Sequence, residues 1–122
     1  AVGAEVARLV AQVSEQKLDD DGEMRPWRAR KEDYLAGVRS GQPEAAAISL
    51  ADKIHNLWSM NQSLEAGEDI FAALSGDAEA QHWFHEAVLE ASRVHDDSRL
   101  PPMRKRLRQE IDRLEDQIQI DA

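Results

Sequence analysis

A chain of 122 residues has room for one domain with one modest hydrophobic core, so we treat residues 1–122 as a single domain. Hydrophobic residues make up 42% of it and charged residues 32%, a balance typical of folded globular chains and not of disordered ones. The net charge of −9 argues against a surface built for nucleic acid, because the phosphate backbone would be repelled.

Neither a run of roughly 18 apolar residues that could span a membrane nor a secretory leader is evident in the sequence. Cysteine is absent, which excludes disulfides, thiolate zinc sites and a cysteine nucleophile. We therefore expect a cytoplasmic protein that does not contact a membrane.

Apolar residues recur along the chain with the period of an α-helix, and no stretch alternates apolar and polar residues as a strand would. Pro26 suits the first position of a helix, the residues around Gly41 form a helix stop, and Asp77 can cap a helix. These signals predict an all-α fold of five to six helical segments. We expect the segments to cover residues up to about 15, then about 26–39, 44–65, 69–74, 77–94 and 103–118.

The third segment is predicted to be an amphipathic helix with an unusual polar face. Helical spacing at about 100° per residue places its apolar side chains together on the core side. These are Ala47, Leu50, Ala51, Ile54, Leu57 and Trp58. The opposite face is expected to carry Ser49, Asp52, His55, Asn56, Ser59, Gln62 and Ser63. Short polar residues are mediocre helix formers, so the face is either a set of buried polar contacts or the wall of a cleft, and composition favours neither.

Residues 48–57, ISLADKIHNL, resemble a signature of HD-domain phosphohydrolases. The closest likeness is to the hydrolase domain of the stringent-response guanosine tetraphosphate enzymes and to their small stand-alone relatives. Residues 27–35, 81–90 and 3–10 are similar to flanking segments of the same proteins, in the same order. The resemblance thus covers most of the chain and implies the C-terminal part of an HD-type helical bundle.

The resemblance also implies a chemistry. In the family, a His, a His-Asp pair and a distant Asp bind one divalent ion, most often Mn²⁺, which activates water for phosphoester hydrolysis. By position, Asp52 is the distant metal ligand, Asn56 contacts the sugar or phosphate of the substrate, and Ser59 lies beside it. The implied substrate is a small phosphorylated nucleotide, with guanosine polyphosphate as one candidate. Trp58 stands where many relatives have arginine, which departs from the usual nucleotide recognition.

The first His and the His-Asp pair of the family belong before the first helix, where this sequence has neither. We therefore expect a truncated hydrolase domain that binds no metal tightly and is inactive alone. Apolar surface left by missing helices should drive formation of a homodimer. The alternative is a non-catalytic helical module that kept the HD scaffold and binds a partner or a nucleotide.

The other histidines are expected to be surface, packing or helix-end residues and not metal ligands. His95-Asp96 has the residues of the family's His-Asp pair but follows Asp52 instead of preceding it, so we do not expect it to be the metal site. His95 is expected to interact with the dipole of a helix C-terminus. His82 and His85 have a spacing that can ligate metal, but we expect surface or core-edge residues because no carboxylate motif is nearby. His55 is expected to pack or to support Asp52.

Two basic groups are the remaining candidates for anion contacts. Lys31, with Arg30, could reach a phosphate from the face beside Tyr34, and a solvated patch is an equally good interpretation. The basic cluster at 104–108 is expected to pair with the acidic residues 19–21, to contact a missing segment, or simply to be exposed.

Overall fold

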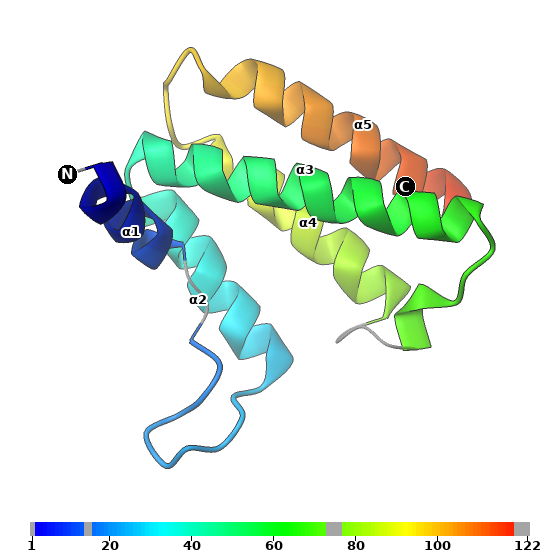
Figure 1. Cartoon of the computed structure of the whole chain (residues 1–122), viewed down its shortest axis with the longest axis horizontal. Helices are drawn as coiled ribbons and strands as arrows, with labels where there is room; N and C mark the ends of the chain where they lie inside the picture. The colour runs from blue at the N-terminus through cyan, green and yellow to red at the C-terminus, as the bar shows by residue number, and fades with distance from the viewer. Residues whose placement is uncertain (1, 14–15, 73–76, 119–122) are drawn as a thin grey trace.

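The computed structural model describes residues 2–13, 16–72 and 77–118, and in these parts the chain forms five α-helices and one short 3₁₀ turn (Figure 1). They are α1 (Val2–Gln12), α2 (Trp27–Ser40), α3 (Pro43–Glu65), the 3₁₀ turn η1 (Ile70–Ala72), α4 (Ala78–Ser92) and α5 (Leu100–Ile118). The predicted all-α class is confirmed. The described residues contain no strand, only one isolated bridge between Leu18 and Met24 in the loop after α1. None of the helices in these ranges has the length and apolar character needed to cross a membrane.

Helix α3 lies at the centre of the fold, with α5 along one side and α4 along another (Figure 1). Ion pairs link Glu44 to Arg99 near the starts of α3 and α5, and Glu65 to Arg113 nearer their ends, so these two helices run parallel. Helix α4 returns in the opposite direction, and α2 packs against it. Helix α1 lies against the first half of α3, and the α1–α2 loop projects from the body.

The core is an aliphatic seam shared by α3, α4 and α5, extended by residues of α2. Its fully buried members include Leu50 and Leu57 of α3 and Leu107, Ile111 and Leu114 of α5. Burial of each such side chain contributes about 1.5–3 kcal/mol, so the helical stripe of α5 alone supplies much of the attraction between α3 and α5. An aromatic cluster borders this seam on the side of α2 and contains Trp27, Tyr34, Trp83 and Phe84.

A buried polar network interrupts the seam between α3 and α5. The side chain of Glu110 is completely buried, and Asn61 Nδ2 donates to its Oε1 at 3.1 Å and to its backbone carbonyl at 3.0 Å. Arg113 Nη1 donates to the same carboxylate at 2.7 Å, and Arg106 pairs with its other oxygen. Gln117 Nε2 completes the network by donating to Asn61 Oδ1 at 2.9 Å. Each polar group gains a partner, which is the condition for burying a charge without a large penalty.

Most predicted helix limits agree with the structure within a few residues. Asp77 caps α4 as predicted, because its carboxylate accepts a hydrogen bond from the Ala80 backbone N at 2.9 Å. Two limits differ: α4 ends at Ser92, short of the predicted 94, and α5 begins at Leu100, before the predicted 103. Two prolines occupy the first turn of α5, where a missing N–H leaves no helical hydrogen bond unmade.

Two predicted boundaries fall at positions outside the described residues. The first helix ends at Gln12 within the described range, whereas its predicted end, near Glu15, lies outside it. The predicted turn over residues 69–74 is described only as the 3₁₀ turn, and the closing Ser75 and Gly76 also lie outside.

Gly37 allows α1 and α2 to approach closely. A Cβ atom built at this position would collide with the backbone carbonyl oxygen of Gln12. The side chain of Gln12 accepts a hydrogen bond from the Gln42 backbone N at 2.8 Å, which ties the end of α1 to the α2–α3 connection. The absence of a side chain at Gly37 therefore places α1 on the bundle.

Candidate functional site

A cavity of about 400 Å³ opens between α2, α3 and α4. It is lined by Lys31 of α2, by Lys53, His55, Asn56, Ser59 and Met60 of α3, and by Gln81, Phe84 and His85 of α4. Three of the four predicted site residues, Lys31, Asn56 and Ser59, thus share one cavity although they come from two helices. A volume of this size is in the range of small-molecule sites in proteins.

Asp52, the predicted metal ligand, lies one turn before Asn56 with a side chain that is 55% exposed. Its Oδ2 accepts hydrogen bonds from Lys53 Nζ at 3.0 Å and from Asn56 Nδ2 at 3.4 Å. Asp52 itself lines a second hollow of about 330 Å³ that faces α1 and includes Tyr34. It therefore lies on the rim between the two hollows and is connected to the larger one through Lys53 and Asn56.

Two ammonium groups flank one aromatic ring at the cavity. Lys31 Nζ lies 4.8 Å from the centre of the Phe84 ring, and Lys53 Nζ lies 5.3 Å from it. Lys53 is also 4.9 Å from the Tyr34 ring centre, and only 11% of its side chain is exposed. Contacts with ring faces stabilise cations and hold them in place, so these two charges are positioned before any ligand arrives.

His85 contributes a neutral imidazole to the same cavity. The side chain is 2% exposed, and Nδ1 lies 2.7 Å from the Gln81 carbonyl oxygen. A carbonyl can only accept, so Nδ1 carries the proton and Nε2 is a hydrogen-bond acceptor. Burial, with the charges of Lys53 and Lys31 as smaller causes, lowers the pKa of His85 to about 4. Among the described residues, no group donates a hydrogen bond to the buried Nε2.

These features define the ligand chemistry that the cavity can accept. The two lysines attract an anion, and the Asn56 amide and Ser59 hydroxyl can bind its oxygen atoms. His85 Nε2 needs a donor, which a hydroxyl or an amino group would supply. A phosphorylated molecule that also carries hydroxyl or amino groups meets both requirements.

The polar face predicted for the third helix is partly wrong. Ser49 was expected on the polar face but is buried, with its Oγ 2.6 Å from the Tyr34 hydroxyl. Trp58 and Ala51, expected on the core side, are exposed. The reason is that α3 has neighbours on several sides, so its surface does not divide into one buried and one open face.

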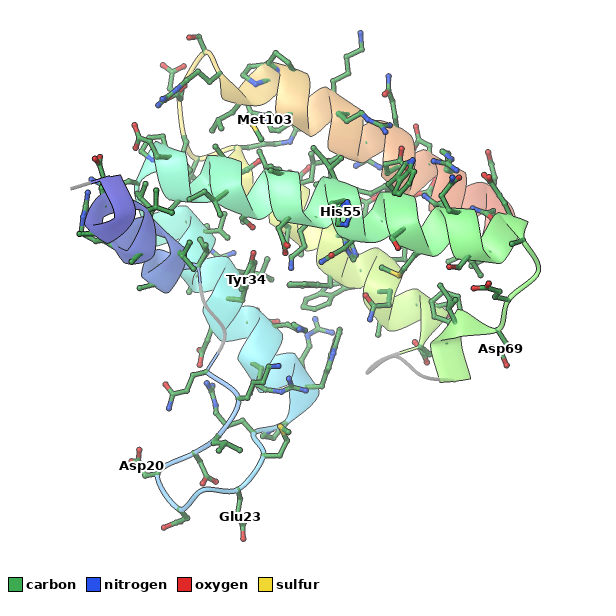
Figure 2. The ribbon with its side chains drawn as sticks, viewed as in Figure 1. Asp20, Glu23, Tyr34, His55, Asp69 and Met103 are labelled. Carbon is green, nitrogen blue, oxygen red and sulfur yellow. The ribbon has the colours of Figure 1, made fainter. Side chains whose placement is uncertain are left out.

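His55 is exposed, lines the cavity, and stacks on Trp58 with ring centres 6.2 Å apart. Figure 2 labels His55 on the central helix and Tyr34 on α2. The His55–Trp58 pair therefore forms an aromatic surface beside the cavity, where the sequence predicted a packing or supporting role for His55.

His95 contacts the C-terminal turn of a helix as expected, but that helix is α2 and not the one that precedes it in the chain. Helix α4 ends at Ser92, and the Nε2 atom of His95 lies 2.7 Å from the Val38 carbonyl oxygen of α2. Because a carbonyl accepts, His95 donates this hydrogen bond and fastens the α4–α5 connection to α2.

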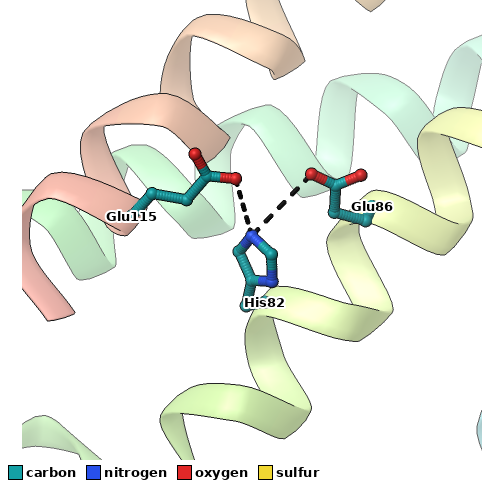
Figure 3. Close-up of side chains that lie close together, drawn as sticks. All are labelled: His82, Glu86 and Glu115. Carbon is teal, nitrogen blue, oxygen red and sulfur yellow. Dashed lines mark hydrogen bonds and ion pairs between the residues drawn. The ribbon is translucent and has the colours of Figure 1, made fainter. Parts of the chain in front are cut away.

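His82 and His85 point to different neighbours in spite of their helical spacing. His85 lines the cavity, whereas His82 contacts Glu115 of α5 and its own helix neighbour Glu86 (Figure 3). The expectation that no carboxylates lie near His82 is wrong. The spacing of His82 and Glu86 by four residues was the one sequence signal for this cluster.

The basic cluster at 104–108 does not pair with the acidic loop, contrary to one expectation. Arg106 pairs with Glu110, and Arg108 binds both carboxylate oxygens of Glu86 at 2.8 and 3.2 Å. These partners lie on α5 itself and on α4, so the cluster serves packing between helices. Lys53 is the site residue that the sequence did not single out, because one lysine among helical polar residues resembles any solvated charge.

No protein-family model matches the chain, and no curated protein matches it. The function is therefore inferred from the residues and their geometry.

Proposed function

We propose that this chain is the substrate-binding portion of an HD-type, metal-dependent phosphohydrolase that acts on a small phosphorylated nucleotide. The observation that carries the proposal is the shared cavity of Lys31, Asn56 and Ser59, with Asp52 hydrogen-bonded to Asn56 at its rim. Lys31, Asn56 and Ser59, which the sequence singled out on two helices, thus lie where a single ligand could touch them.

Asp52 fits the role of one metal ligand. Its carboxylate is a hard oxygen donor of the kind that Mn²⁺ accepts, and its exposure leaves room for an ion and water. The ammonium of Lys53 competes for the same oxygen, but a lysine–carboxylate pair at a half-exposed position is weak and can be displaced. A bound ion would supply an acidified water and polarise a phosphoryl oxygen.

The remaining ligands of the proposed metal site lie outside these 122 residues in our proposal. In the family that the chain resembles, a His and a His-Asp pair precede the segment similar to residues 3–10. Among the described residues, the one cluster of three potential metal ligands is His82, Glu86 and Glu115, which does not include Asp52. We therefore expect these 122 residues alone to show neither Mn²⁺ affinity through Asp52 nor phosphohydrolase activity.

The cavity side chains have complementary roles toward the substrate. Lys31 and Lys53 neutralise phosphate charge, while Asn56 and Ser59 orient the phosphate or the sugar by hydrogen bonds. His85, neutral at pH 7, accepts a hydrogen bond from a sugar hydroxyl or a base amino group. None of these groups needs to move a proton, so the role of this portion is to bind and orient the substrate.

Substitutions in a longer protein that includes the coding sequence preceding Ala1 test the proposal. Asp52→Asn should abolish hydrolysis and weaken Mn²⁺ binding together. Asn56→Ala should impair use of the substrate while metal remains bound, and Lys31→Ala should have the smallest effect of the three. The exposed Asp116 of α5 offers a matched control, since Asp116→Asn should change neither property. Full activity of Asp52→Asn, or hydrolysis by the 122 residues alone, would contradict the proposal.

A non-catalytic module that binds a nucleotide or a partner is the second candidate, favoured because the described part of the chain groups no other potential metal ligands with Asp52. The two candidates differ upstream: a His and a His-Asp pair encoded before Ala1 support the enzyme, and their absence supports the module. Nucleotide binding to the 122-residue chain is compatible with both candidates and does not separate them.

Our proposal includes a homodimer formed through α1. Val6 and Val10 of this helix are 47% and 43% exposed, and such side chains favour burial against a second copy. Light scattering at high concentration should show twice the monomer mass, and a monomer there would refute this part of the proposal.

A further inference from the structure

A second cluster of ionisable side chains lies between α4 and α5, apart from the cavity. His82 and Glu86 are one turn apart on α4, and Glu115 faces them from α5 (Figure 3). His82 Nε2 lies 2.8 Å from Glu115 Oε1 and 3.7 Å from Glu86 Oε1. All three side chains are mostly buried, with 17%, 33% and 19% exposure for His82, Glu86 and Glu115.

The cluster places two carboxylates around one imidazole. One imidazole N–H can donate to Glu115 but cannot also reach Glu86 at 3.7 Å. Arg108 binds both carboxylate oxygens of Glu86, and Asp112 lies 3.8 Å from the same guanidinium. Three carboxylates thus act on the single guanidinium of Arg108, which favours a further cation.

The donor set matches a divalent transition-metal ion. One imidazole nitrogen and two carboxylate oxygens are typical zinc ligands, with bonds of about 2.0–2.2 Å and water at the fourth position. The three donor atoms lie within 4.8 Å of one another, close enough for small rotations of the two carboxylates to surround an ion. The ion would replace the hydrogen bond between His82 Nε2 and Glu115, and the carboxylates of Glu86 and Glu115 would balance its charge.

The Arg108–Glu86 pair is the main competitor of an ion at this place. Both side chains are about one-third exposed, so water screens the pair and an ion can compete for Glu86. Glu86 Oε1 can therefore turn to an ion while Arg108 moves toward Asp112. The guanidinium would then stay beside the site and balance the second carboxylate.

We propose that His82, Glu86 and Glu115 form a binding site for one divalent transition-metal ion such as Zn²⁺, which clamps α4 to α5. This site shares no residue with the proposed phosphohydrolase centre at Asp52. It can therefore be loaded in the 122-residue chain by itself.

Calorimetric titration of the 122-residue chain with Zn²⁺ tests the proposal. We expect one ion per chain, with affinity lowered at least tenfold by His82→Ala and by Glu115→Gln. The second variant keeps the shape of the side chain, and circular dichroism shows whether each variant remains folded. Zinc should also shift the ring ¹⁵N resonances of His82, a readout that a merely structural contact would not give.

Two variants serve as matched controls. Glu79→Gln removes an exposed carboxylate from the first turn of α4, and Asp52→Asn removes the ligand of the other proposed centre. Both should keep full zinc affinity. No measurable binding, or binding that survives His82→Ala and Glu115→Gln unchanged, would overturn the inference. Loss of zinc binding in Asp52→Asn would also overturn it, and would assign the ion to the centre at Asp52.

Discussion

His85 should make the protein markedly less stable in mild acid. Its pKa is about 4 in the fold, against an ordinary value of 6.5, because the imidazole is buried beside two lysines. Between these two values the unfolded chain binds a proton that the folded chain rejects, so stability is present above pH 6.5 and is lost as the pH falls toward 4. The full shift corresponds to about 3 kcal/mol, of which about 2 kcal/mol is lost by pH 5.

Urea unfolding at pH 7 and at pH 5 measures this loss. The variant His85→Gln keeps a polar side chain but cannot titrate, so its free energy of unfolding should fall by about 2 kcal/mol less than that of the original chain over this pH interval. Ionisable carboxylates contribute equally to both proteins and cancel in the comparison. His55→Gln is the matched control for the loss of an imidazole, because that side chain is exposed. Equal losses in the original chain and in His85→Gln would refute the argument that burial keeps His85 neutral.

Three further predictions concern packing, the buried charge and the cavity. Gly37→Ala should separate α1 from α2 and lower the free energy of unfolding by about 1–3 kcal/mol in thermal unfolding. Gly3→Ala, with open space around it, should not lower the free energy of unfolding, and equal effects of the two substitutions would contradict the close approach of α1 and α2. Glu110→Ala should lower the free energy of unfolding by about 3 kcal/mol or more, because two arginines and an asparagine lose their partner. A change below about 1 kcal/mol would show that the network is not formed. Lys53→Ala should weaken binding of a nucleoside polyphosphate at least tenfold by calorimetry, while Lys105→Ala, on the exposed face of α5, should not. Similar affinities of the two variants would show that the ligand does not bind in the cavity.

The sequence predicted the helices well because local signals determine them. Apolar residues at helical spacing, the cap at Asp77 and the stop near Gly41 act within one or two turns, and the structure contains the corresponding elements. Three of the four predicted site residues, Lys31, Asn56 and Ser59, line a common cavity, whereas Asp52 lines another hollow beside it.

The features that the sequence did not predict depend on which helices meet. Glu110 resembles any exposed charge of a polar helix until Asn61 and Arg113 approach it. His85 resembles a core-edge histidine until the two lysines converge on Phe84 beside it. Ser49 is buried because Tyr34 of another helix offers it a hydroxyl. Each of these depends on a contact between residues of different helices, which the periodicity of one helix does not contain.

The buried network around Glu110 has a consequence for the alignment of α3 and α5. An aliphatic seam alone would tolerate a slide of one helix along the other, because one leucine can replace another after a shift of one turn, about 5.4 Å. Such a slide would carry Glu110 away from Asn61 and leave the carboxylate without one of its donors in apolar surroundings. The hydrophobic residues thus supply the attraction between the two helices, and the Asn61–Glu110 contact selects one register among several that would otherwise be similar in energy.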